Sequence, residues 1–291
     1  MNIFRVVGRG LMVPFYSSGS RIISASQESK VSSASNPDWK IFPPEQQPYR
    51  NLKLRVSMSK DEIKAISDRY RGVIRSSFSQ YYAPGIAPQE LLFEPTGSAK
   101  YISLWFKNRE RILERFINKG GASFVKDFAG AEMLIIGPGK GAAEVLEFIK
   151  SFPNLRSIHI VNILDEQFIN LDNELQDYKD RGGTIKPTIY AYKINTLELP
   201  QDLTGSMDMV YHANVFDPEY FSPLQRQQSA HEIVRILKHG GIDATPVQTV
   251  LGSLFFSSST FDNHEDGFTK YLEREGLIPL KRGNFQIRYK K

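Results

Sequence analysis

Three glycines at alternate positions follow a short apolar run, and their spacing is the clearest chemical signal in this chain. Residues 133–136 read Met-Leu-Ile-Ile, and they lead into Gly137, Pro138, Gly139, Lys140 and Gly141. This order predicts a buried parallel strand, a tight turn and the start of a helix. Glycine lets a backbone approach a ligand closely, and the free N–H groups of a helix start attract anions. We therefore expect a nucleotide-like ligand on this turn.

A second group of polar residues follows a predicted strand over residues 207–211. Tyr211 ends the strand, and His212, Asn214 and Asp217 come directly after it. Ligands bind outside the carboxyl ends of the strands in doubly wound sheets, so this segment is predicted to face the transferred group. His212 is the candidate general base for a hydroxyl or amine nucleophile, and Asn214 and Asp217 are candidate substrate contacts. The alternative is that His212 only caps the strand or packs against a cofactor.

The elements that would position these residues alternate along the second half of the chain. Strands are predicted over 133–136, 157–161, 188–192, 207–211 and 241–245, and helices over 142–151, 166–180 and 223–238. Such alternation indicates right-handed crossovers and a mainly parallel sheet. A helix over 265–275 precedes two short strands over 277–281 and 285–289. Together these strands predict a terminal hairpin, which makes the last strand antiparallel to its neighbour.

The first half of the chain has a different texture, and we divide the sequence into three parts. Residues 1–55 are predicted to be an irregular arm, residues 56–124 a helical appendage and substrate lid, and residues 125–291 the α/β domain. Ser59 and Glu62 form a capping-box pattern before a helix over 59–82. A second helix is predicted over 98–118. Its buried side is expected to carry Tyr101, Leu104, Trp105, Ile112 and Phe116.

Residues 125–291 resemble the class I S-adenosylmethionine (SAM)-dependent methyltransferases. The glycine turn carries part of the resemblance, and residues 206–210 are similar to that family's fourth strand. Residues 232–241, Glu-Ile-Val-Arg-Ile-Leu-Lys-His-Gly-Gly, are similar to its E-x-x-R-x-L-K-P-G-G segment, with His239 in the place of the proline. The resemblance implies a doubly wound seven-stranded, mainly parallel sheet of the Rossmann-like methyltransferase type. It also implies one antiparallel strand and a C-terminal hairpin.

The resemblance also implies how SAM would be held. The glycine turn would wrap the methionine part, Asn162 and Ile163 the ribose, Asn195 and Thr196 the adenine edge, and Tyr211 would complete the cofactor site. The sequence departs from the family at three positions that usually carry an acid, now Ile135, Asn162 and Asn195. Asp165 and Glu166 are close enough to replace the ribose acid. The departures leave three readings open: weaker SAM binding, a different nucleotide-like ligand, or a member without catalytic activity.

The function we expect is SAM-dependent methyl transfer to an oxygen or nitrogen of a small molecule. One alternative is transfer of the aminopropyl or aminocarboxypropyl arm of SAM, although Ala213 stands where such enzymes carry an aspartate. Another is a binding protein that kept the fold without catalysis. A nicotinamide dinucleotide ranks lower, although Gly137, Gly139 and Ala142 also fit its glycine fingerprint. A dinucleotide site predicts an acid near Asn162, and it does not account for the sequence of residues 235–241.

Composition narrows the protein class only broadly. The chain has 291 residues, no cysteine, a net charge of +5 and a pI of about 9.2. Disulfides and thiolate sites are therefore excluded, and no apolar run reaches the roughly 18 residues of a membrane span. We see no nucleic-acid module and no metal-ligand constellation, so a small molecule is the expected partner. The oligomeric state stays open, with a dimer as one option.

The N-terminal residues leave two localisations open. No acid precedes Glu28, and Arg5, Arg9 and Arg21 lie among apolar residues and serines. This is the composition of an organelle transit peptide, which would place the protein in the mitochondrial matrix and remove residues 1–27. Pro14 and Gly19 interrupt any long helix, so we favour a flexible arm on a cytoplasmic protein.

Overall fold

The computed structural model describes most of the chain from residue 39 onward. The described residues are 39–65, 98–108, 110–138, 142–163, 165–212, 215–216, 221–246, 268–281 and 285–291. Residues 38–291 form one compact unit. Several predictions lie outside the described residues: the arm over 1–38, most of the helix over 59–82, and Gly139, Lys140, Gly141, Asn214 and Asp217.

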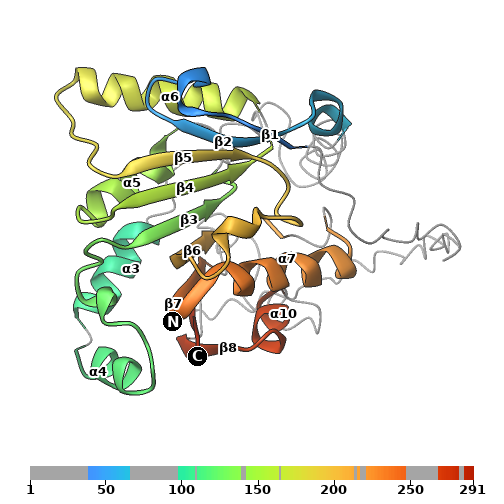
Figure 1. The fold of residues 1–291 in the computed structure, drawn as a ribbon. Helices are drawn as coiled ribbons and strands as arrows, with labels where there is room; N and C mark the ends of the chain where they lie inside the picture. Colours follow the sequence, from blue (N-terminus) through green and yellow to red (C-terminus); the bar gives the residue numbers. More distant parts are fainter. Residues whose placement is uncertain are drawn as a thin grey trace, which may run out of the picture. The chain divides into compact units, whose positions relative to one another are not determined.

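One sheet of nine strands organises this unit (Figure 1). In chain order the strands are β1 (Trp39–Ile41), β2 (Lys53–Met58), β3 (Glu132–Ile136), β4 (Ser157–Asn162), β5 (Thr188–Lys193), β6 (Met207–His212), β7 (Leu237–Pro246), β8 (Leu277–Lys281) and β9 (Phe285–Lys290). Their spatial order is β1-β2-β5-β4-β3-β6-β7-β9-β8. The run β5-β4-β3-β6-β7 is parallel, and β9 is antiparallel to both β7 and β8. The predicted seven-stranded doubly wound sheet with its terminal hairpin is therefore confirmed.

Two strands at one edge of the sheet were not predicted. β2 pairs parallel with β5, and β1 pairs antiparallel with β2, in a stretch that we expected to be irregular. Long-range contacts hold this stretch in place. The carboxylate of Asp172 accepts hydrogen bonds from the backbone N–H groups of Arg50, at 3.1 Å, and Asn51, at 2.6 Å. Leu52 and Leu54 then enter the core with 2% and 1% of their surface exposed.

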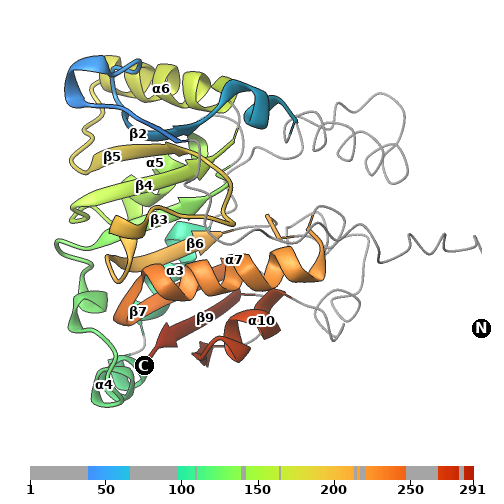
Figure 2. The same cartoon turned by 45° about the vertical axis from the view of Figure 1, so that its right-hand side comes forward.

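Helices cover both faces of the sheet (Figure 2). They are α3 (Ser98–Lys107), α4 (Glu110–Asn118), α5 (Ala143–Ser151), α6 (Asp165–Asp180), α7 (Pro223–Ile236) and α10 (Phe268–Arg274), with 3-10 turns η2 (Pro44–Gln46), η3 (Ser123–Lys126) and η4 (Gln201–Leu203). Successive residues of a strand point to opposite faces. Accordingly, Met133 and Ile135 of β3 pack in one core with α3, α4, α5 and α6. Leu134 and Ile136 pack in a second core with α7 and α10.

The helix predicted over 98–118 is two helices, α3 and α4. The prediction of which residues lie on its buried side was wrong in part. Trp105 and Phe116 are buried as expected, but Tyr101 and Leu104 are 41% and 45% exposed. Helical periodicity locates an apolar stripe only when one stripe is present, and α3 carries apolar residues on more than one side. The buried side instead includes Ile102, which joins the same core as α5. The lid function of this region remains a prediction.

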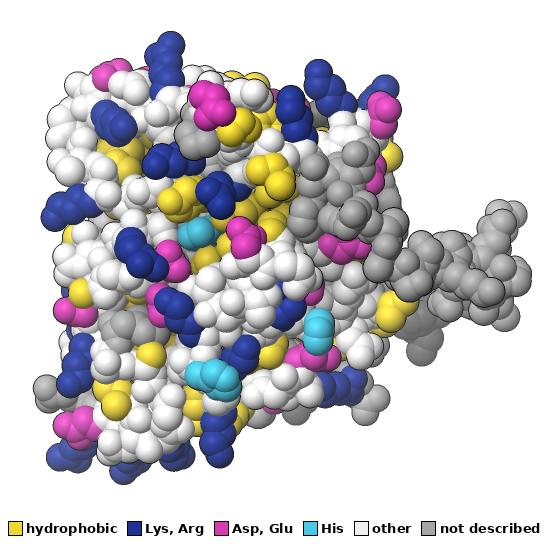
Figure 3. Space-filling view, in the orientation of Figure 1, with side chains coloured by type: hydrophobic (Ala, Val, Ile, Leu, Met, Phe, Trp, Pro, Cys, Tyr) yellow, Lys and Arg dark blue, Asp and Glu magenta, His cyan; other side chains and the backbone are white. Residues whose placement is uncertain are grey.

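Charged side chains tie the sheet together at the amino ends of its strands. Asp208 of β6 accepts a hydrogen bond from the backbone N–H of Glu132, at 2.8 Å, and from Lys238, at 2.9 Å. On the face drawn in Figure 3, Lys and Arg side chains are interspersed with Asp and Glu side chains rather than gathered in one patch. Within the described ranges, no helix is long and apolar enough to cross a membrane.

Candidate functional site

Four strand ends meet at one edge of the sheet, and they bring the predicted cofactor residues together. Ile136 of β3 pairs with Val161 of β4 on one side and with His212 of β6 on the other. Asn162 of β4 pairs with Lys193 of β5. Because these strands are parallel, the segments that follow them start at the same edge. We call the group formed by Gly137, Asn162, Asn195 and the ends of these strands the carboxyl-edge site.

Gly137 is the first residue of the predicted ligand turn, and its backbone requires a glycine. Its φ is +59°, in the left-handed region that other residues rarely adopt. Its N–H donates to the carbonyl of Val161 at 2.9 Å. A Cβ added to Gly137 would lie 2.8 Å from Cγ2 of Val215. The absence of a side chain therefore accommodates Val215, which follows β6, and Pro138 comes next on the partly exposed edge.

The start of α5 already holds an anion supplied by the protein. The backbone N–H of Ala142 donates to the carboxylate of Glu174, on α6, at 2.7 Å. We expected these N–H groups to attract the carboxylate or phosphate of a ligand. The first of them is instead capped by a side chain that lies 32 residues further along the chain. A negative charge at this helix start repels a second anion.

Asn162 and its neighbours lie at the end of β4, where the resemblance places a ribose. The amide oxygen of Asn162 accepts a hydrogen bond from the backbone N–H of Ile163 at 2.7 Å. That oxygen keeps a second lone pair. Asp165, which we considered as a replacement for the missing acid, begins α6 and forms an ion pair with Lys193 at the end of β5. A carboxylate is therefore present near this edge, but a cation already partners it.

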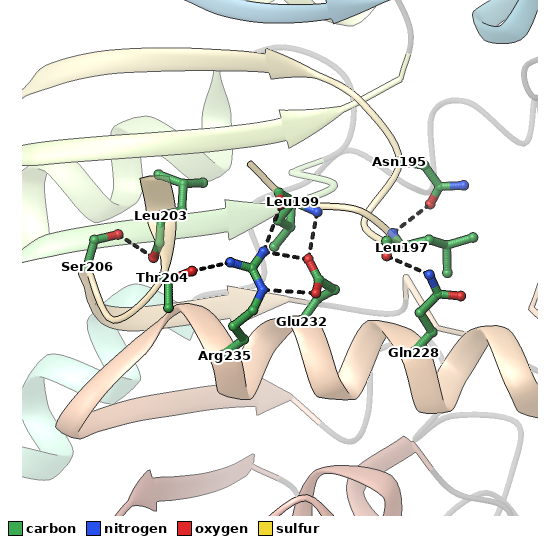
Figure 4. A network of polar contacts seen from close by, with 9 residues as sticks. All are labelled: Asn195, Leu197, Leu199, Leu203, Thr204, Ser206, Gln228, Glu232 and Arg235. Atoms are coloured by element: carbon green, nitrogen blue, oxygen red, sulfur yellow. Dashed lines mark hydrogen bonds and ion pairs between the residues drawn. The ribbon is translucent and has the colours of Figure 1, made fainter. Parts of the chain in front are cut away.

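The loop after β5 carries Asn195 and Thr196. The amide oxygen of Asn195 accepts a hydrogen bond from the N–H of Leu197 at 3.3 Å, which forms a local turn. In Figure 4 the amide nitrogen of Asn195 points away from the network around it. Thr196 is buried, and its hydroxyl lies 3.3 Å from that of Ser229 on α7. Asn195 thus shapes the turn of this loop, whereas Thr196 fastens the loop to α7.

The Glu232 and Arg235 side chains hold the same loop from α7 (Figure 4). Arg235 forms a two-pronged ion pair with Glu232 at 3.0 and 2.6 Å, and it donates to the carbonyl of Leu199 at 2.7 Å. It also contacts the hydroxyl of Thr204. Glu232 accepts a hydrogen bond from the N–H of Leu199 at 2.7 Å. Glu232 and Arg235, the E-x-x-R part of the segment over residues 232–241, therefore position the loop that carries Asn195.

Tyr211 and His212 occupy opposite faces of the sheet at the end of β6. Tyr211 is 1% exposed and packs edge-on against Phe148 of α5, with ring centroids 4.7 Å apart. Its side chain belongs to the core and not to the carboxyl edge. His212 is 4% exposed and lies against Phe216 and Phe268. Neither side chain is accessible enough for the contact that we predicted from the sequence.

His212 belongs to a buried ionic chain that sequence reasoning missed. Its Nε2 lies 3.1 Å from Oδ1 of Asp243 on β7, and Nη1 of Arg288 on β9 donates to the other oxygen of Asp243 at 3.1 Å. Burial alone would raise the pKa of Asp243, but the charges and hydrogen bonds of His212 and Arg288 hold that pKa below its ordinary value. Asp243 is therefore a carboxylate that lies between Arg288 and the ring of His212.

His159 lies apart from this site, in the middle of β4. Its ring nitrogens contact the hydroxyl groups of Ser157, at 3.1 Å, and Tyr192, at 3.0 Å. Burial, and then the charges of Arg55 and Arg156, lower the pKa of His159 to about 3. The ring is therefore neutral at physiological pH and too weak a base for catalysis.

Known proteins that align with this chain do so by structure and not by sequence. No family model and no curated protein sequence matches this chain. Among solved structures, the geranyl diphosphate C-methyltransferase from Streptomyces coelicolor A3(2) aligns with a TM-score of 0.42 and 12% identity, over 78% of this chain and 98% of that one. The N-methyltransferase NodS from Bradyrhizobium japonicum WM9 aligns with a TM-score of 0.38 and 15% identity, over 63% and 97%. The aminoglycoside resistance methyltransferase NpmB1 aligns with a TM-score of 0.41 and 14% identity, over 63% and 93%.

These structural neighbours are methyltransferases that share little sequence with this chain. The strand order β5-β4-β3-β6-β7-β9-β8, with β9 antiparallel, is the order expected for the Rossmann-like fold of class I SAM-dependent methyltransferases. Our assignment of the fold depends on this order and not on the TM-scores. The fold by itself does not determine the acceptor substrate.

Proposed function

We propose that this protein binds SAM at the carboxyl-edge site and transfers its methyl group to a small-molecule acceptor. The observation that carries the proposal is the position of Gly137. In the sheet, β4 and β5 lie on one side of β3, whereas β6 and β7 lie on the other. Gly137 therefore follows the strand at which the sheet changes direction, and ligands of open α/β sheets bind at such switch points.

The polar groups of the edge suit the ribose and adenine of an adenosyl compound. The free lone pair of the Asn162 oxygen accepts a hydrogen bond from a ribose hydroxyl, with Ile163 beside it. The outward amide nitrogen of Asn195 donates to a ring nitrogen of adenine, which is an acceptor. Amides bind less strongly than the carboxylates usual in this family. We therefore expect micromolar rather than tighter affinity.

SAM supplies an electrophilic methyl group on a sulfonium when it is bound. The protein contributes position rather than proton transfer, because both ring nitrogens of His212 have partners within the protein, Asp243 and Thr245. His212 is therefore not the general base. An acceptor that is already unprotonated needs only to be held in line with the methyl group, and such alignment supplies much of the rate.

A nicotinamide dinucleotide fits this edge less well than SAM. Its pyrophosphate needs the N–H groups at the start of the helix after the glycine turn. In this protein the carboxylate of Glu174 occupies the N–H of Ala142. SAM carries an ammonium and a sulfonium beside its single carboxylate, so it meets less repulsion there.

A binding protein without catalysis is the second candidate. The contact of Val215 with Gly137 favours it, because this contact takes up space next to the turn. The engagement of both nitrogens of His212 favours it too. On this reading an adenosyl ligand binds, but no group is transferred.

Calorimetric titration with SAM, S-adenosylhomocysteine and NAD tests the ligand. We expect micromolar binding of both adenosyl compounds and none of NAD, and silence at millimolar SAM would overturn the proposal. Incubation with SAM and candidate acceptors then separates the reaction types. S-adenosylhomocysteine as product indicates methyl transfer, whereas methylthioadenosine indicates transfer of an aminopropyl or aminocarboxypropyl arm. No product from any acceptor favours the binding protein.

A further inference from the structure

Three neighbouring strands each contribute one ionisable side chain to a chain of buried polar contacts. His212 comes from β6, Asp243 from β7 and Arg288 from β9, and the three are 4%, 0% and 0% exposed. The strand register brings them together, because Asp243 is paired with Arg288 and with Val210, two residues before His212. Glu273 adds a second acid, 3.8 Å from Nε of Arg288.

The hydrogen bonds around His212 engage both of its ring nitrogens. Nε2 lies 3.1 Å from Oδ1 of Asp243, which is a carboxylate. The hydroxyl of Thr245 donates to the backbone carbonyl of His212 at 2.8 Å and lies 3.3 Å from Nδ1. The ring therefore has a partner within the protein on each side.

Such a chain adds little to the free energy of unfolding, because taking charged groups out of water offsets most of their attraction. Buried ion pairs replaced by apolar residues of similar size often leave a protein as stable as before. The chain is also incompletely satisfied, because Nε and Nη2 of Arg288 have no hydrogen-bond partner among the described residues. What it does provide is a fixed position for the His212 ring, which has a partner on each nitrogen.

The ring of His212 transmits that position to the carboxyl-edge site. It packs edge-on against Phe216, at 5.2 Å between ring centroids, and Phe268, at 5.3 Å, and these two phenyl rings stack at 4.0 Å. Val215 precedes Phe216 and lies against Gly137. A continuous series of contacts thus runs from Arg288 to the first residue of the ligand turn.

We propose that Arg288, Asp243, Thr245 and His212 are positioning residues for the carboxyl-edge site. They fix Phe216 and Val215 relative to Gly137 and thereby set the affinity for the amino-acid end of the adenosyl ligand. This inference rests on the proposed function. It assigns no contact with the ligand to any of these four residues, and it gives His212 a positioning role instead of a catalytic one.

Two variants test the proposal without deleting a whole side chain. Thr245→Val keeps the shape of the side chain but removes the hydroxyl, and His212→Phe keeps a ring against Phe216 but removes both hydrogen bonds. We expect Thr245→Val to weaken S-adenosylhomocysteine binding about tenfold, the effect of losing one buried hydrogen bond, and His212→Phe to weaken it at least as much. Thr245→Ser, unlike Thr245→Val, keeps the hydroxyl, and its affinity should be within about threefold of the wild type.

The matched control is His231→Phe. His231 lies on α7 and pairs with Glu275 at 3.0 Å, but its side chain is 63% exposed and the pair does not reach the carboxyl edge. This variant should bind S-adenosylhomocysteine as the wild type does. Asp172→Ala serves as a second control, because it lowers stability at the far edge of the sheet, near Arg50.

Hydrogen exchange gives a readout that does not depend on the ligand. In Thr245→Val and His212→Phe, the peptides that contain Gly137 and Val215 should exchange faster, while both controls leave them unchanged. Folded variants with wild-type affinity and wild-type exchange overturn the positioning role, as does equal weakening in Asp172→Ala. If the wild type binds no adenosyl compound, the proposed function fails. Faster exchange in Thr245→Val and His212→Phe would then still support the positioning of Gly137, without the effect on ligand affinity.

Discussion

Replacing Arg235 by alanine tests whether the α7 network holds the loop after β5. Arg235 and Glu232 are 14% and 11% exposed and form a two-pronged ion pair. In Arg235→Ala the Glu232 carboxylate keeps only the N–H of Leu199, and the carbonyl of Leu199 loses its bond from Arg235. Breaking a buried pair on one side costs about 3–5 kcal/mol. We expect a loss of about 3 kcal/mol here, because the pair keeps some solvent contact.

Urea denaturation followed by circular dichroism measures this loss, and a surface pair provides the control. Arg156 and Glu132 lie 2.7 Å apart, but the Arg156 side chain is 63% exposed. Arg156→Ala should therefore cost less than about 1 kcal/mol. Arg235→Lys keeps the charge without the planar fork and should fall between the two. If Arg235→Ala costs no more than Arg156→Ala, the network does not hold the loop as we describe.

Three further changes test other parts of the structure. Gly137→Ala should lower the free energy of unfolding by at least about 1–2 kcal/mol, because alanine is strained in the left-handed backbone conformation at this position. Adding Val215→Ala should recover only the further loss caused by the contact between the new Cβ and Val215. Urea denaturation measures both variants. Asp172→Ala should cost about 1–3 kcal/mol, because the partly buried N–H groups of Arg50 and Asn51 lose their acceptor, and thermal denaturation measures it. His159 is neutral when folded, with a pKa of about 3, but binds a proton below about pH 6.5 when unfolded. The stability that depends on a neutral His159 is therefore fully present above about pH 6.5 and is lost as the pH falls toward 3, by about 5 kcal/mol. This loss should be absent in His159→Gln.

The sequence predicted the central strands and their common edge because the signal there is local. The run over residues 133–136 that became most of β3 is apolar without alternation, as a strand buried on both faces must be, and the runs that became β4 and β6 are mostly apolar. The glycine at position 137 could be placed for the same reason, since a left-handed turn after such a strand favours that residue. The carboxyl-edge site follows from parallel pairing alone.

Other parts of the fold depend on partners that lie far away in the sequence. β1 and β2 belong to the sheet because Asp172 anchors residues 50–51, a contact across about 120 positions. Similarly, Glu174 caps α5 from the next helix. No local pattern indicates either contact, which is why the start of α5 was expected to be free for a ligand.

The buried ionic chain left one trace in the sequence that could have revealed it. Asp243 and Thr245 alternate with apolar residues in β7, and Gln286 and Arg288 do the same in β9. Strands that alternate in this way place their polar residues on one face. Matching polar faces on two strands that pair in one sheet indicate a polar contact between them. The position of His212 beside that contact could come only from the strand register.

A crystal structure of the protein with S-adenosylhomocysteine tests the central claim most directly. We predict the adenosyl group at the carboxyl ends of β3, β4 and β5, with the ribose beside Asn162, the adenine beside Asn195 and the amino-acid end next to Gly137. Val215 should move away from Gly137 only as far as the ligand requires. A saturated crystal in which that edge stays closed by the protein's own side chains, or in which the ligand binds elsewhere, would contradict the claim.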